Sequence, residues 1–531
     1  MSKEEIISIS DVACEKHSQP SPEIITTKLD PLASLQVKLA PAMLYVVSMA
    51  QFIDIVNGSS MTVALVDIST HLGFDSYSAQ WIISSYIVTF GGFLLLFGRV
   101  GDMYGHGRVF LVGQLWFGLW SLVISFSNGP AMFCITRALQ GIGGAMTIPC
   151  ALALITTTYP AGPKRTKALA IFAGFGAGGA VIGLLLAGAL ISSLGWSWIF
   201  RLSGIFSFLL FVIGFATIPT KAQKTASFRI DIVGSLTATA SLICILYYIS
   251  TGSGTGWASV QTLPVLAVGL VLFAVFVWVE LRVAKYPIMP FSIWCLKNFS
   301  SSFVAILFLQ GQFQGFCYFA TLIFQNVMGY SSMQTALAFL AHSLFAVFAF
   351  TALGKILPKY PLKPFILIGF VLRCVAALMF AFVHSSTNYW TLPFCGLLMH
   401  VLGMGTSILP AQITALKDAQ NDNQGVVGAL YSTAMQLGAP IGLAIVTAIS
   451  ENSVTLNDMP GSTERLMQSY RNGLLGVVGL GVIGFLISVY MIPFTRPTPT
   501  AASTPAQAVE DMSLPSTIMD VDPVETKALS S

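Results

Sequence analysis

The chain has 531 residues, of which 55% are hydrophobic and only 9% carry a charge. Soluble domains typically have about 25% charged residues, so this composition excludes a string of soluble domains and indicates an integral membrane protein. The formal net charge is +4. The basic residues collect in loops between apolar runs, so the charge reports membrane topology and gives no sign of a nucleic-acid partner.

Apolar runs of about 20 residues, the length that crosses a bilayer as a helix, recur between two polar tails. The N-terminal tail, 1–40, has no apolar core suited to a cleavable signal peptide. The C-terminal tail, 495–531, is rich in Pro, Ser, Thr and Ala and is predicted to be disordered. Between them we predict an all-α fold with fourteen transmembrane helices, at 42–66, 79–97, 109–127, 131–157, 167–192, 197–218, 231–252, 262–284, 301–325, 334–357, 364–383, 389–413, 425–449 and 472–493.

Lys and Arg mark the cytoplasmic side of a membrane protein. They follow the even-numbered runs, for example Arg99 and Arg108 after the second and Lys164 and Arg165 after the fourth. The loops after odd-numbered runs have none before Arg465. We therefore expect both termini in the cytoplasm of a multi-pass protein. The plasma membrane is the expected location, with a vacuolar membrane as the alternative.

The first apolar run carries a carboxylate, Asp54, near its middle. A carboxylate in hydrocarbon is costly and is seldom retained without a function. We interpret Asp54 as a group that binds a proton or contacts a substrate, because burial favours its neutral form while a nearby cation favours its charged form. The alternative is a fixed acid that is hydrogen-bonded or ion-paired.

The fourth run contains an arginine, Arg137, about a third of the way through the membrane. Arginine stays charged at biological pH, so at this depth it needs an acid or several carbonyls, and Asp54 is the natural partner. Gln140 follows one turn along the same helix face. A static clamp between the first and fourth helices is one interpretation of Arg137, and a part in proton coupling is the other.

The chain also repeats itself. GRVGDMYGHGRVFLVG at 98–113 is similar to GKILPKYPLKPFILIG at 354–369, and Pro149 of the fourth run matches Pro410 of the twelfth. Transporters are often built from such repeats, with substrate bound between the halves. The predicted domains are a six-helix bundle at 41–220, two inserted helices at 221–297 and a second six-helix bundle at 298–494.

Three segments carry a family resemblance: Gly98–Arg108, Arg137–Ala145, and Ala50–Asn57 taken with Trp81, Tyr86 and the Gly195–Phe200 turn. They resemble motifs of the major facilitator superfamily, and most of all its fourteen-span drug:proton antiporter branch in fungi. The resemblance implies the major facilitator fold, with two six-helix bundles plus two inserted spans. It also implies a proton-coupled exporter of a drug, toxin or secondary metabolite that works by alternating access, with Asp54, Arg137 and Gln140 in proton coupling.

The Gly98–Arg108 segment is expected to act at the inner gate. Asp102 is predicted to cap a helix N-terminus or to pair with a cation of a neighbouring helix, with Arg99 and Arg108 as the basic residues of the segment. The family usually has further basic residues at three positions, which here are Met103, His106 and Gly107. Their loss weakens the expected charge latch.

The fifth run is rich in glycine, and Gly179 and Gly183 form a G-x-x-x-G face that allows close helix packing. The thirteenth run repeats this face with Gly438 and Gly442, around Pro440. We predict close packing against the eighth run or its counterpart, or a hinge that favours antiport. The resembling motif commonly has a proline that the fifth run lacks, which argues against the hinge.

Polar side chains inside the apolar runs mark the predicted substrate cavity, because amides facing lipid are costly. Gln310 and Gln314 share one helix face among aromatic residues, which suits a moderately polar aromatic or heterocyclic ligand. For the amides the alternative is interhelical hydrogen bonding, and for His342 and His400 it is ordinary packing. Arg373 is expected either to attract an anionic group or to be buried against a carbonyl-rich helix end. The predicted cavity residues are Asn57, Gln310, Gln314, Phe316, Tyr318, Arg373, His400 and Gln436.

No G-x-x-x-x-G-K-[ST] loop is present, so direct ATP hydrolysis is excluded on motif grounds. No nucleophile motif or Cys/His cluster predicts an enzyme, a metal site or another cofactor. The expected partners are a small-molecule substrate, protons and the lipid bilayer, and the expected state is a monomer. Proton-coupled import of a nutrient or siderophore, and a membrane sensor that transports nothing, are the alternatives.

Overall fold

The computed structural model describes residues 31–492, except 76–77, 160–162, 219–231, 284–290, 295, 358–359, 418–423 and 453–462. Within these residues the regular secondary structure is helical throughout. The elements are α1 (Pro31–Leu72), α2 (Trp81–Tyr104), α3 (His106–Ile124), α4 (Pro130–Thr158), α5 (Pro163–Ser193), α6 (Ser197–Thr217), α7 (Ile232–Thr255), α8 (Leu263–Trp278), η1 (Val279–Val283), α9 (Phe291–Trp294), α10 (Lys297–Leu322), η2 (Ile323–Val327), α11 (Ser332–Ile356), α12 (Leu362–Ala381), α13 (Leu392–Leu416), α14 (Gln424–Asn452) and α15 (Thr463–Met491).

The membrane-spanning character predicted from the apolar runs is confirmed. In the described chain, 12 helices are long and apolar enough to cross a bilayer. A further one, α2, is bent by 49° between Trp81–Leu94 and Leu96–Tyr104. In α7 the apolar part within the described residues covers only Leu236–Ile249. Each of the predicted runs coincides with a long helix, but the count of fourteen membrane spans is not confirmed.

Local sequence signals set several helix ends. Pro130 begins α4, where its fixed φ suits the first turn and its missing N–H costs no hydrogen bond. A capping box begins α11, because the Ser331 side chain accepts from the backbone N–H of Gln334 and the Gln334 side chain accepts from the backbone N–H of Ser331. Gly195, with φ at +89°, makes the turn between α5 and α6 that other residues rarely adopt.

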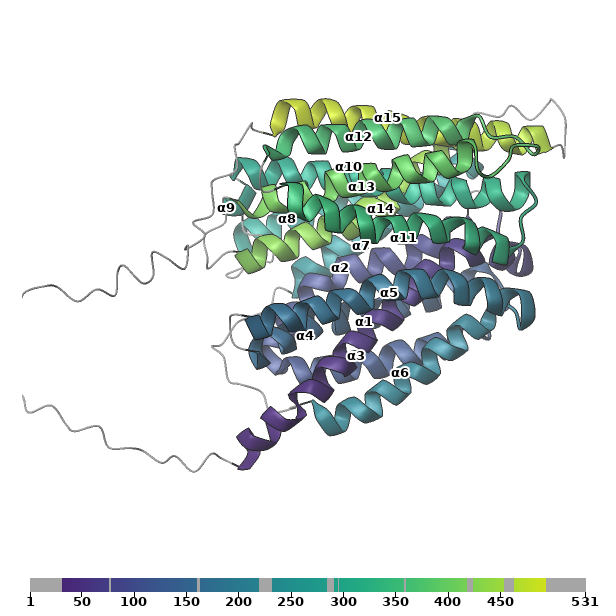
Figure 1. The fold of residues 1–531 in the computed structure, drawn as a ribbon. Coiled ribbons are helices and arrows are strands. Elements are labelled where there is room, and N and C mark those ends of the chain that lie inside the picture. The colour runs from purple at the N-terminus through teal and green to yellow at the C-terminus, as the bar shows by residue number, and fades with distance from the viewer. Residues whose placement is uncertain are drawn as a thin grey trace, which may run out of the picture.

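The helices form two groups, one of α1 to α6 and one of α10 to α15 (Figure 1). In the first group α1 packs on α5, α3 on α4 and α3 on α6. The second group repeats these pairs as α10 on α14, α12 on α13 and α12 on α15. The groups meet where α5 packs on α11 and α2 on α14, while α7 lies against α2 and α14, and α8 against α7. The exact domain boundaries stay predictions.

The glycine faces of α5 and α14 serve equivalent contacts. A Cβ on Gly183 would lie 2.7 Å from the carbonyl oxygen of Val56, so α1 packs directly on the backbone of α5. A Cβ on Gly438 would lie 2.8 Å from the Cα of Leu307 on α10. The predicted close packing of the Gly179–Gly183 face is present, but the helix that occupies this face is α1 and not the eighth run.

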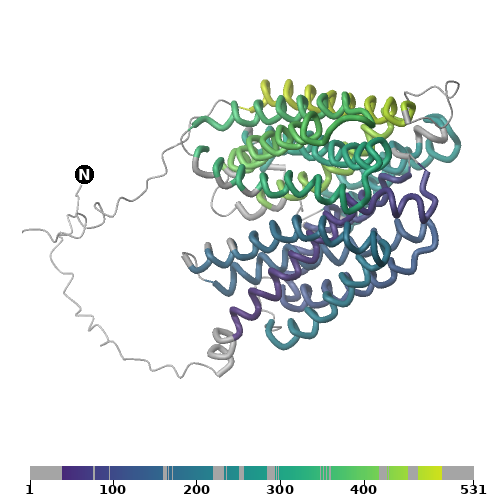
Figure 2. Tube along the Cα trace, turned by 45° about the vertical axis from the view of Figure 1, so that its right-hand side comes forward, coloured from purple at the N-terminus to yellow at the C-terminus, as the bar shows by residue number. Residues whose placement is uncertain are grey.

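The two groups are joined at one end and separate at the other. An apolar cluster away from the N-terminal ends of α1 and α10 includes residues of both groups, such as Val63 and Ile68 of α1 with Phe324 of η2 and Ala336 of α11. Near the N-terminal ends of α1 and α10, each group has its own cluster. Figure 2 shows α1 crossing diagonally from the free end of its group to this junction. We call the shared cluster the outer seal, because the topology predicted from the basic residues places it toward the outer side of the membrane.

Candidate functional site

The acid of the first helix is bound by a phenol of the second. The hydroxyl of Tyr86 on α2 donates a hydrogen bond to Oδ1 of Asp54 on α1. Tyr86 is 6% exposed, whereas Asp54 is only partly buried although it lies in the interior of the 34-residue apolar segment Leu39–Leu72. Asp54 therefore has a neutral hydrogen-bond partner and is still partly exposed.

Arg137 is buried next to Asp54. It is 1% exposed, and one of its terminal nitrogens donates to Oδ1 of Asn57 at 3.0 Å and to Oε1 of Gln140 at 2.7 Å. The guanidinium also lies over the ring of Tyr86, with its carbon 4.7 Å from the ring centroid. Tyr86 thus contacts the acid through its hydroxyl and the cation through its ring face.

The network continues to the third helix. Nε2 of Gln140 donates to Oγ of Ser121 on α3 at 2.7 Å. The ring of Tyr86 is held by a stacked contact with Phe90, whose centroid is 5.8 Å away. A Cβ on Gly144 would lie 2.9 Å from the Phe90 ring, so the glycines of α4 let it approach α2 closely. Polar side chains of α1, α2, α3 and α4 are therefore connected inside one bundle.

Arg137 is not ion-paired to Asp54. Ion pairs of the described residues include Asp67 with His71 and Asp102 with His106, and neither involves Asp54 or Arg137. Arg137 is instead clamped to Asn57, and its Nε is buried without a hydrogen-bond partner. The clamp between the first and fourth helices is thus present, and Arg137 acts on Asp54 through space and through the Tyr86 ring. The roles in proton coupling stay predictions.

The predicted cavity residues fall into separate places. Gln310 and Gln436 are partly exposed and Gln314 is 9% exposed. In the described part of the chain, Gln310 and Gln314 have no hydrogen-bond partner, whereas their neighbour Gln312 bonds the backbone of Val477 at 3.4 Å. A Cβ on Gly91 of α2 would lie 2.8 Å from Cβ of Gln436, which places Gln436 at the junction of the groups. Asn57 belongs to the Arg137 network.

The remaining four predicted cavity residues are buried inside the second group. Phe316 is fully buried and stacks on His400, with ring centroids 4.0 Å apart. Tyr318 is 4% exposed and packs against Phe319. Arg373 is 1% exposed, and one of its terminal nitrogens donates to the backbone oxygen of Leu309. Phe316 and Tyr318 belong to the outer seal.

The Gly98–Arg108 segment is helical and has a single break. α2 runs to Tyr104, Gly105 adopts φ +94°, and α3 begins at His106. Asp102 lies in the last turn of α2 and contacts Nε2 of His106 at 3.2 Å. The capping interpretation is wrong, because the N-cap of α3 is Gly105, without a side-chain cap. Arg108 is exposed and Arg99 partly exposed, and the gating role of the segment stays a prediction.

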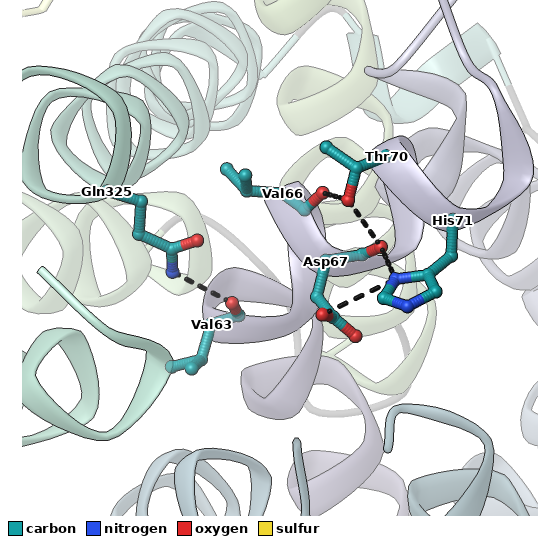
Figure 3. Close-up of polar contacts among 6 residues, drawn as sticks. All are labelled: Val63, Val66, Asp67, Thr70, His71 and Gln325. Carbon is teal, nitrogen blue, oxygen red and sulfur yellow. Dashed lines mark hydrogen bonds and ion pairs between the residues drawn. The ribbon is translucent and has the colours of Figure 1, made fainter. Parts of the chain in front are cut away.

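The outer seal contains a hydrogen bond that crosses between the groups. Nε2 of Gln325 in η2 donates to the backbone oxygen of Val63 in α1 at 2.9 Å (Figure 3). One turn further along α1, Nδ1 of His71 lies 3.5 Å from Oδ1 of Asp67. Neither Gln325 nor the hydroxyl of Tyr86 stood out as a partner in the sequence, where the only available signal was a polar side chain within an apolar run.

Comparison with known proteins agrees with this architecture. The model of the Major Facilitator Superfamily matches residues 47–443. The chain belongs to the Major Facilitator Superfamily. The structure of the nucleoside transporter NupG superimposes with a TM-score of 0.62 at 13% identity, over 86% of this chain and 100% of that one, which shows the shared fold.

Named proteins are 27% to 31% identical to this chain over most of its length. The puromycin resistance protein pur8 of Streptomyces alboniger is 31% identical over 77% of this chain and 81% of its own. The multidrug transporter mfsC of Aspergillus fumigatus is 28% identical over 82% and 85%. The low affinity ammonium transporter of Saccharomyces cerevisiae is 27% identical over 77% and 80%.

In the described part of the chain, no group of three or more His, Cys, Asp or Glu side chains could hold a metal ion. The chemistry available at the site is therefore that of a carboxylate, a phenol, a guanidinium and amides. Together these groups can bind and release a proton and can form hydrogen bonds to a ligand. The family and fold are those of transporters.

Proposed function

We propose that this protein exports small organic molecules across its membrane in exchange for protons, and that Asp54 is the group that binds the proton. The observation that carries the proposal is a partly exposed carboxylate inside a membrane helix, held by a neutral phenol and not by an ion pair. An acid clamped by a guanidinium would stay charged, whereas one bound to a phenol can exist in both forms. Relatives named for puromycin resistance and multidrug transport support the export of small molecules.

The proton site and the outer seal share one helix. Asp54 and Val63 are nine residues apart in α1, which corresponds to about 13 Å along the helix. Loading Asp54 with a proton removes its charge beside Arg137 and changes the α1–α2–α4 contacts. A shift of α1 also moves Val63, whose backbone oxygen accepts the hydrogen bond of Gln325. In this way a proton that enters from the outer side favours release of substrate outward, and the proton then leaves to the cytoplasm as the outer seal closes and the protein returns.

The energy source is sufficient for export. One charge moving through a membrane potential of 100 mV contributes about 2.3 kcal/mol. This corresponds to a substrate ratio of tens-fold before any pH gradient is added, because about 1.4 kcal/mol changes a ratio tenfold. We further propose that the termini are cytoplasmic, that the membrane is the plasma membrane, and that the protein acts as a monomer.

The substrate contacts that we propose are amides at or near the junction of the two groups. Gln310, Gln314 and Gln436 keep some exposure, and Gln436 lies against α2. Amides can donate to and accept from carbonyls, amines and ring nitrogens, which suits moderately polar heterocyclic compounds.

We propose that two contacts control the inner gate. One joins Asp102 to His106, and the other is the packing of Gly179 and Gly183 against the backbone of α1.

Flux into liposomes tests both the direction and the coupling. The purified protein is reconstituted, an acidic or an alkaline lumen is imposed, and labelled puromycin is added outside. Antiport predicts accumulation in the acidic lumen, and a protonophore abolishes it. Accumulation in an alkaline lumen would indicate proton symport instead.

Import is the second candidate, because one relative is named as an ammonium transporter. Labelled methylammonium in the same assay tests it, and import predicts uptake of this cation that puromycin does not inhibit. Saturable binding of puromycin without flux in either gradient would indicate a sensor.

A further inference from the structure

The core of the second helix group contains a buried cation whose hydrogen-bonding capacity is largely unused. Arg373 of α12 is 1% exposed and donates through one terminal nitrogen to the backbone oxygen of Leu309 on α10. Its Nε and its other terminal nitrogen are buried and have no hydrogen-bond partner. A guanidinium has five N–H donors, so most of them point at no acceptor.

No carboxylate balances this charge within the described residues. The ionisable groups that act on Arg373 are Cys317 and Cys374, Tyr431, and two histidines, His342 and His400. All of these are neutral or positive at ordinary pH. The other buried arginine, Arg137, differs, because Asp54 lies within its electrostatic reach. An uncompensated buried charge is strongly destabilising, so an anion near Arg373 has a clear energetic reason.

A second buried nitrogen without a hydrogen-bond partner belongs to a histidine of α13. Nε2 of His342 and Nδ1 of His400 are 3.1 Å apart, so one ring donates to the other. Nε2 of His400 is buried without a partner, and the residue is fully buried. When His342 is the donor, His400 carries its own proton on Nε2 and presents it as a free donor. The stacked ring of Phe316 holds His400 in place.

Helix packing brings Arg373 and His400 against the same helices. A Cβ on Gly403 of α13 would lie 2.7 Å from Cγ of Arg373, so the arginine stem crosses α13 at Gly403. His400 is three residues earlier on α13, on the same helix face. On α10, Leu309 accepts from Arg373 while Phe316, two turns on, stacks against His400. Arg373 and His400 therefore both lie where α10 packs against α12 and α13.

We propose that Arg373 and His400 bind a small monovalent anion, of the size and charge of chloride, between α10, α12 and α13. One negative charge neutralises Arg373, and the ion accepts hydrogen bonds from the guanidinium and from Nε2 of His400. Burial of both side chains excludes an organic substrate from this place. The site is independent of Asp54, and the anion stabilises the second helix group.

Halide dependence of stability tests the proposal with the full-length protein in detergent. Thermal unfolding is followed as gluconate is replaced by chloride or bromide at constant ionic strength. The midpoint is expected to rise with either halide and to saturate, because a ligand that binds only the folded state stabilises it. Arg373→Met is expected to abolish this rise, whereas Arg201→Gln, a partly exposed cation on α6, is expected to keep it.

Two further measurements keep the proposal testable if Arg373→Met does not fold. His400→Phe preserves the ring stack but removes the donor, and it is expected to raise the half-saturating bromide concentration at least tenfold. Crystals grown in bromide should give an anomalous peak between Arg373 and His400. A midpoint that does not respond to halide, an equal response in Arg373→Met, or no anomalous peak at this place would each overturn the proposal.

Discussion

The ring of Tyr86 lies between the acid and the cation of the first helix group: its hydroxyl donates to Asp54 while its face packs against Arg137, 4.7 Å from the ring centroid. Tyr86 therefore contacts both the acidic and the basic side chain. When Asp54 takes up a proton, the phenol loses an anionic acceptor, and Arg137 loses the negative charge that offsets its own. In the proposed mechanism, this arrangement converts a change of protonation into a change of contacts among α1, α2 and α4.

Replacing Asp54 by Asn should abolish transport driven by a pH gradient. The amide resembles the protonated acid in shape but can neither bind nor release a proton. Flux of labelled substrate in liposomes with an imposed gradient is expected to fall to the level of protein-free vesicles. Substrate exchange at equal pH is expected to continue, because it needs no net proton movement. Asp67→Asn, at the outer end of the same helix, is the control and should keep driven flux; retained driven flux in Asp54→Asn would end the coupling role.

Replacing Tyr86 by Phe should move the pH dependence of transport to higher pH. The variant keeps the ring over Arg137 but removes the hydrogen bond that favours the carboxylate form of Asp54. The neutral form then persists at lower proton concentration. A hydrogen bond to a charged group contributes about 1.5–3 kcal/mol, so we expect a shift of about one to two pH units in the midpoint of flux against pH. An unchanged profile would show that the phenol does not act on the proton site.

Replacing Arg137 by Lys should lower both stability and flux. Lysine keeps the charge but loses the planar guanidinium, one terminal nitrogen of which donates to both Asn57 and Gln140. Loss of one such bond should reduce the free energy of unfolding by about 1.5–3 kcal/mol, measured by denaturation in detergent. Arg201→Lys, in which the cation lies over Trp198 at 5.2 Å, should change it far less. Equal effects of the two substitutions would reduce Arg137 to a simple cation.

Adding a methyl group to the α5 backbone should disrupt its contact with α1. In Gly183→Ala the new Cβ would meet the backbone of Val56, with its Cα 2.8 Å away. Overpacking of this kind costs about 1–3 kcal/mol, so the thermal midpoint and the flux are both expected to fall. Gly178→Ala is the matched control on the same helix, because a Cβ there meets nothing within 4 Å. Similar losses in the two variants would contradict a specific contact.

Removing the amide of Gln325 should weaken the outer seal. Gln325→Leu deletes the hydrogen bond to Val63, and a bond of about 1 kcal/mol corresponds to about a fivefold change in the population of the open state. Spin labels at Leu194→Cys and Trp390→Cys, both on exposed loop positions, report the separation of the two groups. The long-distance population is expected to grow in Gln325→Leu but not in His71→Ala, whose contacts stay within α1. An unchanged distance distribution would remove Gln325 from the seal.

The membrane character, the positions of the long helices and the pairing of the first six with the last six followed from local patterns. Each depends on about 20 consecutive apolar residues or on a repeated motif, and such signals are contained within single segments. The buried acid and the buried arginine could also be found this way, because a charge inside an apolar run is conspicuous without any knowledge of its neighbours.

Side-chain partners, by contrast, were decided by the tertiary structure. Arg137 bonds Asn57 across 80 positions of the chain, His342 meets His400 across 58, and Gln325 reaches Val63 across 262. The sequence alone favoured Asp54 as the partner of Arg137 and placed Phe316, Arg373 and His400 in a substrate cavity. The fold instead puts Tyr86 against the acid and buries the other three inside one helix group. Helix rotation and packing determine such contacts, and hydropathy, which counts only how apolar a run is, carries no information about either.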